Sequence, residues 1–194
     1  MKYVAIDEEV EIPDDVSVSI DENKVITVKG KKGEVSKDFG HARFTEITLN
    51  DDKSKVLFHA DFPRQKQIAL VYTLKNILMN MILGVQKEYT YKMKIVYSHF
   101  PITVEPPKGG SDKVLIKNFI GERAPRVTHT VGDVKVTANK EEVIVSGVDK
   151  AAVGQTCGNI QLKCRIKEKD KRIFQDGIYV YEKLLGDEQF WIIR

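Results

Sequence analysis

The sequence predicts an α+β protein of two tandem domains of similar fold, each a small antiparallel sheet packed against one helix. Three observations predict this class: strand-like alternation in both halves, one substantial helical segment in each half, and two hairpins that resemble each other. A length of 194 residues allows either one large domain or two small ones. The repeated pattern favours two domains, over residues 1–84 and 85–194.

The first half is predicted to contain strands followed by one helix. Apolar and polar residues alternate at the strand period, with frequent β-branched residues. The expected strands are 16–20, 25–28, 35–39, 44–49 and 56–60. Pro63 is expected to open the helix and Gly84 to follow its last turn as a capping glycine. Apart from a narrow polar stripe, residues 68–83 are almost all apolar, which predicts that only a thin polar edge is exposed.

The second half repeats this order of elements. Strands are expected within 89–102, over 114–120, and in a hairpin of 134–138 with 143–147. Asp149 is a suitable N-cap for a helix that runs to about Arg165. Four apolar residues recur at helical spacing on this helix and therefore predict a buried seam: Val153, Cys157, Ile160 and Cys164. Gly154 and Gly158 lower the helix propensity and suggest close approach to a neighbouring backbone.

The two hairpins that resemble each other lie in different halves. Residues 16–20 and 25–30 match 134–138 and 143–147 in alternation and in the closing glycine, at an offset of 117 to 118 residues. The match favours two copies of one unit. The alternative is that any two β hairpins share these features.

The composition is not that of a simple polybasic nucleic-acid-binding protein, because the sequence contains 31 basic and 28 acidic residues. The distribution is more informative. Six acidic residues lie in the first 15 positions, so an alternative function is a free-standing protein-interaction module that binds a basic partner through this segment. Basic residues gather instead at 29–32, 108–126 and 163–172.

No pattern indicates an enzyme, a cofactor or a metal centre. The four histidines show no ligand spacing, and neither a CxxC pair nor a nucleotide-binding loop of the expected order is present. Cys157 and Cys164, two turns apart on one helix, are too distant for a disulfide and are expected to be core thiols of a reduced, cytoplasmic protein. The longest apolar stretch, 77–85, is interrupted by Asn80 and Gly84 and is not expected to span a bilayer, so no membrane partner is expected.

Two basic segments are candidate RNA contacts. The first is a turn in which glycines keep the backbone close to a phosphate, formed by Lys29, Gly30, Lys31, Lys32 and Gly33. The second joins cations to aromatic residues and a glycine, and its members are Lys163, Arg165, Lys167, Lys169, Lys171, Arg172 and Gly177. The alternatives are a solvated hairpin tip for the first segment and a solvated charge run for the second.

Six segments in order resemble one family, and they cover nearly the whole chain. They are 25–34, 77–85, 96–102, 116–123, 147–155 and 176–180. The chain resembles the universal L-six family of large-subunit ribosomal proteins, called L-nine in eukaryotic ribosomes. The C-terminal basic segment lacks the proline-rich bacterial form and looks like that of the eukaryotic branch.

The resemblance implies two tandem domains that bind large-subunit rRNA, mainly through the C-terminal domain and its basic tail. It places the protein near the sarcin–ricin region, among neighbouring ribosomal proteins and close to docking translation factors, with no cofactor. The turn at 29–33 matches the family's first-domain motif, and Lys150 and Gln155 match the start of its second helix. Lys171, Arg172 and Gly177 fall in its basic, glycine-containing C-terminal segment.

Overall fold

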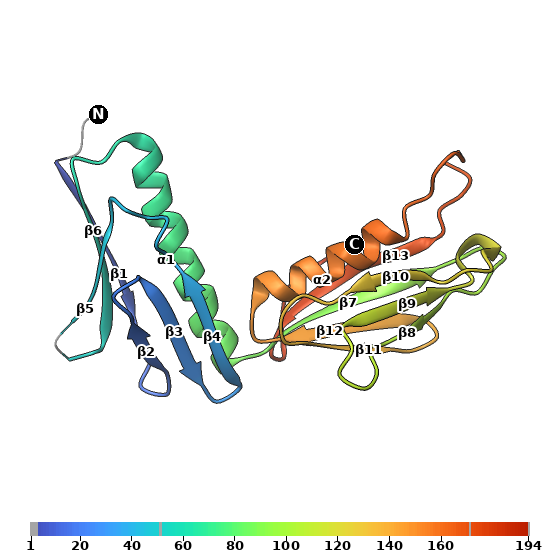
Figure 1. The fold of residues 1–194 in the computed structure, drawn as a ribbon, viewed down its shortest axis with the longest axis horizontal. Coiled ribbons are helices and arrows are strands. Elements are labelled where there is room, and N and C mark those ends of the chain that lie inside the picture. Colours follow the sequence, from blue (N-terminus) through green and yellow to red (C-terminus); the bar gives the residue numbers. More distant parts are fainter. Residues whose placement is uncertain (1–3, 51, 171, 194) are drawn as a thin grey trace. The chain divides into compact units, whose positions relative to one another are not determined.

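The computed structural model describes residues 4–50, 52–170 and 172–193. The chain divides into two compact units, Met1–Lys87 and Glu88–Arg194 (Figure 1). The expected boundary between residues 84 and 85 lies three residues earlier, inside the last turn of the first helix.

The first unit contains two three-stranded antiparallel sheets and one long helix (Figure 1). Its elements are β1 (Ala5–Glu11), β2 (Ser17–Ile20), β3 (Val25–Gly30), β4 (Gly33–Asp38), β5 (Glu46–Leu49), β6 (Lys55–Asp61) and α1 (Gln65–Gln86). One sheet has the order β1-β6-β5 and the other β2-β3-β4. The helix α1 packs against strands of both sheets, so the unit holds two sheets where the sequence predicted one.

Buried residues in the first unit recur with the strand period on β3 and with the helix period on α1, as the sequence predicted. On β3, Ile26 and Val28 are buried while the residues between and beside them are more exposed, as strand alternation requires. On α1, Val71, Leu74 and Leu78 recur at helical spacing and are fully buried. The opposite face of α1 exposes Tyr72, Met79 and Leu83, so its exposed surface is wider and more apolar than the predicted polar edge.

Both ends of α1 differ from the prediction. The helix begins at Gln65, two residues after Pro63, which was expected to open it. The N-cap is Arg64, whose backbone N–H donates to Oε1 of Gln67 at 2.6 Å. Gly84 is a buried residue within the helix, which ends at Gln86, so its expected role as a capping glycine is wrong. By length and composition alone α1 could cross a membrane, but here it is the core helix of the first unit.

Contact with the β3–β4 hairpin keeps the last turn of α1 helical beyond Gly84. The backbone N–H of Lys32 donates to the carbonyl of Val85 at 2.9 Å. A Cβ atom on Gly30 would lie 2.8 Å from that same carbonyl oxygen and from Cγ2 of Val85. Glycine at position 30 is therefore required by packing against the helix.

The second unit is larger and contains a five-stranded and a three-stranded antiparallel sheet with one helix (Figure 1). Its elements are β7 (Tyr89–Val96), β8 (Thr103–Glu105), β9 (Lys113–Lys117), a 3-10 turn η1 (Phe119–Gly121), β10 (Arg126–His129), β11 (Val134–Ala138), β12 (Glu142–Gly147), α2 (Lys150–Lys163), β13 (Gly177–Leu185) and β14 (Glu188–Ile192). The sheets have the orders β11-β12-β7-β13-β14 and β10-β9-β8. The helix α2 packs on the larger sheet and also contacts β10.

Most of the expectations for α2 are confirmed. The side chain of Asp149 caps the helix by accepting a hydrogen bond from the N–H of Ala151 at 3.0 Å. All four residues of the predicted seam are buried: Val153, Cys157, Ile160 and Cys164. The helix ends at Lys163, two residues before the expected end.

The glycines of α2 do not approach a neighbouring backbone, so that expectation is wrong. A Cβ on Gly158 would meet nothing within 4 Å, and one on Gly154 would make only ordinary contact with the ring of Tyr91 at 3.9 Å. This side of α2 is open in the described part of the second unit.

The two units share one strand topology, but the equivalent strands are not the ones that the sequence match between hairpins predicted. The order β1-β6-β5 corresponds to β7-β12-β11, and the order β2-β3-β4 corresponds to β8-β9-β10, with a helix following the last strand of each set. The matched hairpins β2–β3 and β11–β12 are therefore not equivalent, since β11–β12 corresponds to β5–β6. The second unit adds β13 and β14 beyond β7.

The close contact at Gly30 predicts that Gly30→Ala lowers the free energy of unfolding of the first unit by about 1–3 kcal/mol, because the added methyl group overpacks a fixed backbone oxygen. Urea unfolding of the purified chain measures the change. Stability equal to that of the parent chain would show that the hairpin can move away from α1 without loss.

The open space at Gly158 predicts the opposite effect for Gly158→Ala. The methyl group meets no atom and the residue gains helix propensity, so the second unit should become more stable by about 0.5–1 kcal/mol. Thermal and urea unfolding measure the gain. A loss of stability would mean that α2 is more closely covered than its surroundings indicate.

Candidate nucleic-acid interface

The lysine-glycine turn of the first unit is a two-residue hairpin connection between β3 and β4. Gly30 and Gly33 face each other across the pair of strands, and Lys31 and Lys32 form the exposed tip. Because the tip is hydrogen-bonded to the end of α1 through Lys32, its backbone position is fixed.

Two of the three lysines in this turn already face carboxylates of the same unit. Lys29 Nζ lies 3.1 Å from Glu34 Oε2, and Lys31 Nζ lies 3.4 Å from Asp15 Oδ2. A hydrogen bond from Gln86 lowers the pKa of Asp15, so this carboxylate stays charged. Both ion pairs are exposed and therefore weak, but they offset much of the positive charge of the turn.

Lys150 and Gln155 lie on α2, away from the basic C-terminal segment. Lys150 Nζ is 5.7 Å from the ring of Tyr89 and 5.8 Å from that of Phe190, which are cation–π distances. Because Lys150 and Lys163 are the first and last residues of α2, about 20 Å of helix separates them. The predicted site residues of the second unit therefore form two groups.

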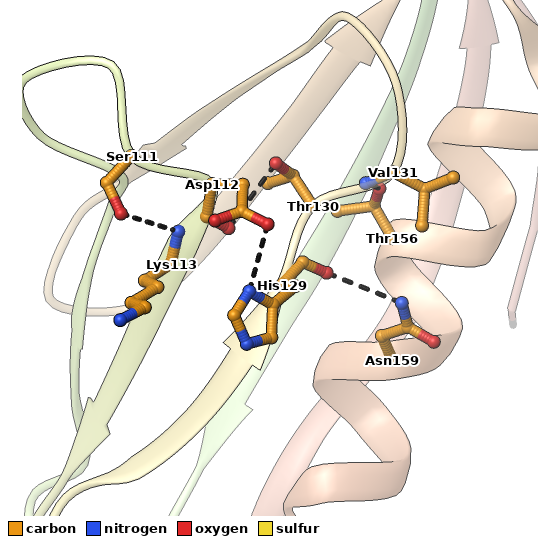
Figure 2. Close-up of polar contacts among 8 residues, drawn as sticks. All are labelled: Ser111, Asp112, Lys113, His129, Thr130, Val131, Thr156 and Asn159. Carbon is orange, nitrogen blue, oxygen red and sulfur yellow. Dashed lines mark hydrogen bonds and ion pairs between the residues drawn. The ribbon is translucent and has the colours of Figure 1, made fainter.

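Polar contacts fix the middle of α2 against the end of β10 and the loop that follows it (Figure 2). Thr156 Oγ1 accepts from the backbone N–H of Val131 at 3.0 Å, and Asn159 Nδ2 donates to the carbonyl of His129 at 3.4 Å. Asn159 also accepts from the amide of Gln155 at 2.9 Å. Gln155 is thus part of the network that positions α2, in addition to being exposed.

The basic segment that follows α2 is a folded loop with outward cations. Asp170 holds this loop together through two hydrogen bonds. Its side-chain carboxylate accepts from the backbone N–H of Arg172 at 2.9 Å, and its backbone carbonyl accepts from the N–H of Phe174 at 2.9 Å. The exposed described cations are Lys163, Arg165, Lys167, Lys169 and Arg172. None of these five side chains forms an ion pair with a described carboxylate, and Lys171 lies outside the described residues.

An open hollow of about 590 Å³ lies beside this loop, at the end of α2. Its walls include Leu162, Phe174 and Tyr179, with Arg165 at the side. Lys169 Nζ lies 4.8 Å from the centre of the Phe174 ring. Cations and aromatic surface therefore occur together here, a combination that is typical of proteins that bind single-stranded nucleic acid.

Gly177 is buried beneath Tyr179 and does not lie on the surface. A Cβ at this position would be 2.6 Å from the hydroxyl oxygen of Tyr179 and 2.7 Å from its Cζ atom. Glycine at position 177 lets the tyrosine ring lie over the start of β13. Nearby, Asp176 is also buried and accepts a hydrogen bond from the N–H of Ser98 at 2.7 Å.

Arg126 is the residue of this region whose role the sequence did not reveal. Its guanidinium donates to both carboxylate oxygens of Glu122, at 2.8 and 2.6 Å, and lies 4.2 Å from the centre of the Phe119 ring. It also donates to the carbonyls of Lys163 at 2.7 Å and Arg165 at 3.3 Å. The hydrogen bond to Glu122 raises the pKa of Arg126, so it is a structural cation that holds the base of the loop.

The charge of the chain is concentrated in the second unit. The first unit contains 13 basic and 14 acidic residues, whereas the second contains 18 basic and 14 acidic residues. This asymmetry favours the second unit as the one that binds a polyanion.

Neither thiol is a reactive group. Burial raises the pKa of Cys157 and of Cys164 to about 12, so both remain protonated at neutral pH. They are free core thiols, as predicted. Among the described residues, no group of histidine, cysteine and carboxylate side chains could hold a metal ion.

The chain is similar over almost its full length to archaeal proteins named large ribosomal subunit protein uL6. It is 46% identical to that of Staphylothermus marinus over 190 residues, which is 97% of this chain and all of the relative. Identity to the protein of Aeropyrum pernix is 46% over 182 residues (94% and 97% of the two chains), and to that of Methanobrevibacter smithii 44% over 179 (92% and 97%). These relatives are archaeal and give no support to the expected eukaryotic branch.

The family match divides between the two units. The model of the family described as ribosomal protein L6 matches residues 12–88 and 110–177. The first segment ends beside the boundary of the first unit, and the second ends at the glycine that opens β13. Most of the chain is covered, and the identity to the archaeal relatives is high. The chain therefore belongs to the ribosomal protein L6 family.

Proposed function

We propose that the protein is a structural constituent of the large ribosomal subunit and binds large-subunit rRNA mainly through its second unit. The family is one of structural ribosomal proteins and not of enzymes, and the relatives carry the name of a large-subunit protein. The contact surface comprises the end of α2 and the described residues of the segment that follows it, 163–170 and 172–176, which we call the cationic loop.

The observation that carries this proposal is the set of five exposed cations that pair with no described carboxylate, in a segment where Arg165 lines an apolar hollow. Lysine and arginine side chains bind phosphate by displacing condensed counterions, and a cation already paired with a carboxylate contributes less. The lysines of the first-unit turn differ in this respect, because Lys29 and Lys31 are paired. The cationic loop is therefore the principal contact, with Lys32 of the first unit as a secondary one.

The proposal extends to the position of the protein in the subunit. Its proposed position is near the sarcin–ricin region, where translation factors dock, with other ribosomal proteins as neighbours, and the resemblance to the family supports this proposal. In this position it would support translation on cytoplasmic ribosomes by holding rRNA in place, with no cofactor. Lys150 would be a separate contact at the start of α2, about 20 Å from Lys163.

The alternative, a protein-interaction module with an acidic N-terminal segment, has less support. Three of the four acidic residues of β1 pair within the first unit: Asp7 with His59, Glu8 with Lys75, and Glu9 with Lys55. The hydrogen bond from Lys75 lowers the pKa of Glu8. These carboxylates belong to a folded strand, so they are not free to attract a basic partner as a flexible tail would be.

Replacing Lys163, Lys167, Lys169 and Arg172 by glutamine tests the principal contact. Each lost phosphate contact should lower the slope of log affinity against log salt by about 1, so the quadruple variant should bind large-subunit rRNA more weakly and lose about 3 to 4 from the slope. Binding to an rRNA fragment that contains the sarcin–ricin region, measured over a series of salt concentrations, gives both quantities.

The matched control removes four exposed lysines elsewhere in the same unit: Lys108, Lys113, Lys135 and Lys140. The net charge changes equally, so this variant should keep most of the affinity and of the slope. Equal losses in both variants would mean that overall charge, and not the cationic loop, provides the binding. No affinity of the parent chain for rRNA would favour the protein-interaction module.

Changing Lys29, Lys31 and Lys32 together to alanine tests the first-unit turn. Because two of these lysines are paired with Glu34 and Asp15, the slope should fall by only about 1. An unchanged slope would remove the turn from the interface. A fall of about 3 would show that both ion pairs open on binding and that the turn is equal to the cationic loop.

A further inference from the structure

We propose that the hollow at the end of α2 binds one unstacked base of RNA, with the base against the ring of Tyr179 and its flanking phosphates against the cationic loop. This inference rests on the proposed function and specifies its ligand: an unpaired nucleotide in a loop or bulge, as opposed to a regular duplex.

The hollow has the size and lining of a binding site for a small planar group. Its volume of about 590 Å³ lies in the range of ligand pockets. Leu162 is exposed to 67% at its edge, and the Phe174 ring forms part of its wall. Such exposed apolar surface gains free energy when a flat apolar ring covers it.

Tyr179 is fixed in position before any ligand binds. Its ring lies over Gly177, where no Cβ could fit, and its hydroxyl donates to the carbonyls of Gln175 at 3.3 Å and Asp176 at 3.5 Å. Burial raises the pKa of Tyr179, so the phenol stays neutral at physiological pH. The side chain is still 40% exposed and can receive a stacked base without reorganisation.

The walls also contain groups that can pair with the polar edge of a base. The side-chain amides of Gln161 and Gln175 both line the hollow, and each amide offers a donor and an acceptor. Arg165 lines it as well, and its planar guanidinium can stack on a base or bind a phosphate.

The charge around the hollow identifies the occupant as a nucleic acid. An apolar hollow alone could take a peptide side chain, but Arg165 lines this one, and Lys169 Nζ lies 4.8 Å from the centre of the Phe174 ring in its wall. Neither cation forms an ion pair with a described carboxylate. A flat apolar ring attached to a polyanionic backbone matches both features. Bases within a duplex are stacked and cannot enter, so the ligand must present an unpaired base.

The test compares two RNA hairpins of equal charge, one with a single-nucleotide bulge that carries 2-aminopurine and one fully paired. The parent chain should bind the bulged RNA about 5- to 150-fold more tightly, the range expected for one stacked base. The fluorescence of 2-aminopurine should change on binding, because stacking on Tyr179 alters its environment.

Variants of the hollow separate stacking from charge. Tyr179→Ala should remove most of the preference for the bulged RNA while leaving the salt slope unchanged, and Tyr179→Phe should retain the preference. Gly177→Ala should act like Tyr179→Ala, because the new methyl group displaces the ring without touching a cation. Tyr97→Ala, a change at a similarly exposed tyrosine outside the hollow, should have no effect.

The possible failures are distinguishable. If neither hairpin nor large-subunit rRNA binds to the parent chain, the proposed function fails. If both hairpins bind equally, and Tyr179→Ala changes neither affinity, the rRNA contact stands but the base-binding hollow is refuted. A circular dichroism spectrum like that of the parent chain shows that each variant is folded.

Discussion

The position of the Arg126 guanidinium determines where the cationic loop begins. The last carbonyl groups of a helix have no partner within it, and an arginine can satisfy several because it carries five N–H donors. Arg126 supplies this need at the end of α2, by donating to the carbonyls of Lys163 and Arg165. Glu122 neutralises its charge, and the ring of Phe119 covers it. The described cations that follow pair with no described carboxylate, so in the proposed function the same kind of residue supports the fold at one position and binds phosphate at the next.

Two glycines connect the fold to the candidate RNA contacts, and both act through packing. The glycine at 30 brings the lysine turn against the end of α1, where Val85 occupies the space of a side chain. The glycine at 177 lets Tyr179 lie over the start of β13. Neither glycine needs to touch RNA for the motif to matter. In each case the small residue fixes a neighbouring group, a turn of lysines in the first unit and an aromatic ring in the second.

The fold class, the two helices and the core of α2 were predictable because they depend on local periodicity. The seam through Cys157 and the cap at Asp149 follow from helix geometry alone. The end of α1 was not predictable, since a tertiary hydrogen bond to Val85 extends the helix past Gly84. The correspondence between hairpins was also missed, because alternation is common to all half-buried strands and only long-range pairing shows which strands are equivalent.

The candidate site shows the same division between local and long-range information. The run of cations after α2 is visible in the sequence, and its charge survives folding because no described carboxylate reaches it. The lysine turn of the first unit looked equally basic, but folding brings Asp15 to Lys31 from 16 positions away. The charge pattern along the chain therefore overestimates the net positive charge of this turn. It also underestimates how much more positive charge remains available in the second unit than in the first. The three-dimensional placement of carboxylates affects which basic segment remains available to phosphate, and in the proposed function it favours the second unit.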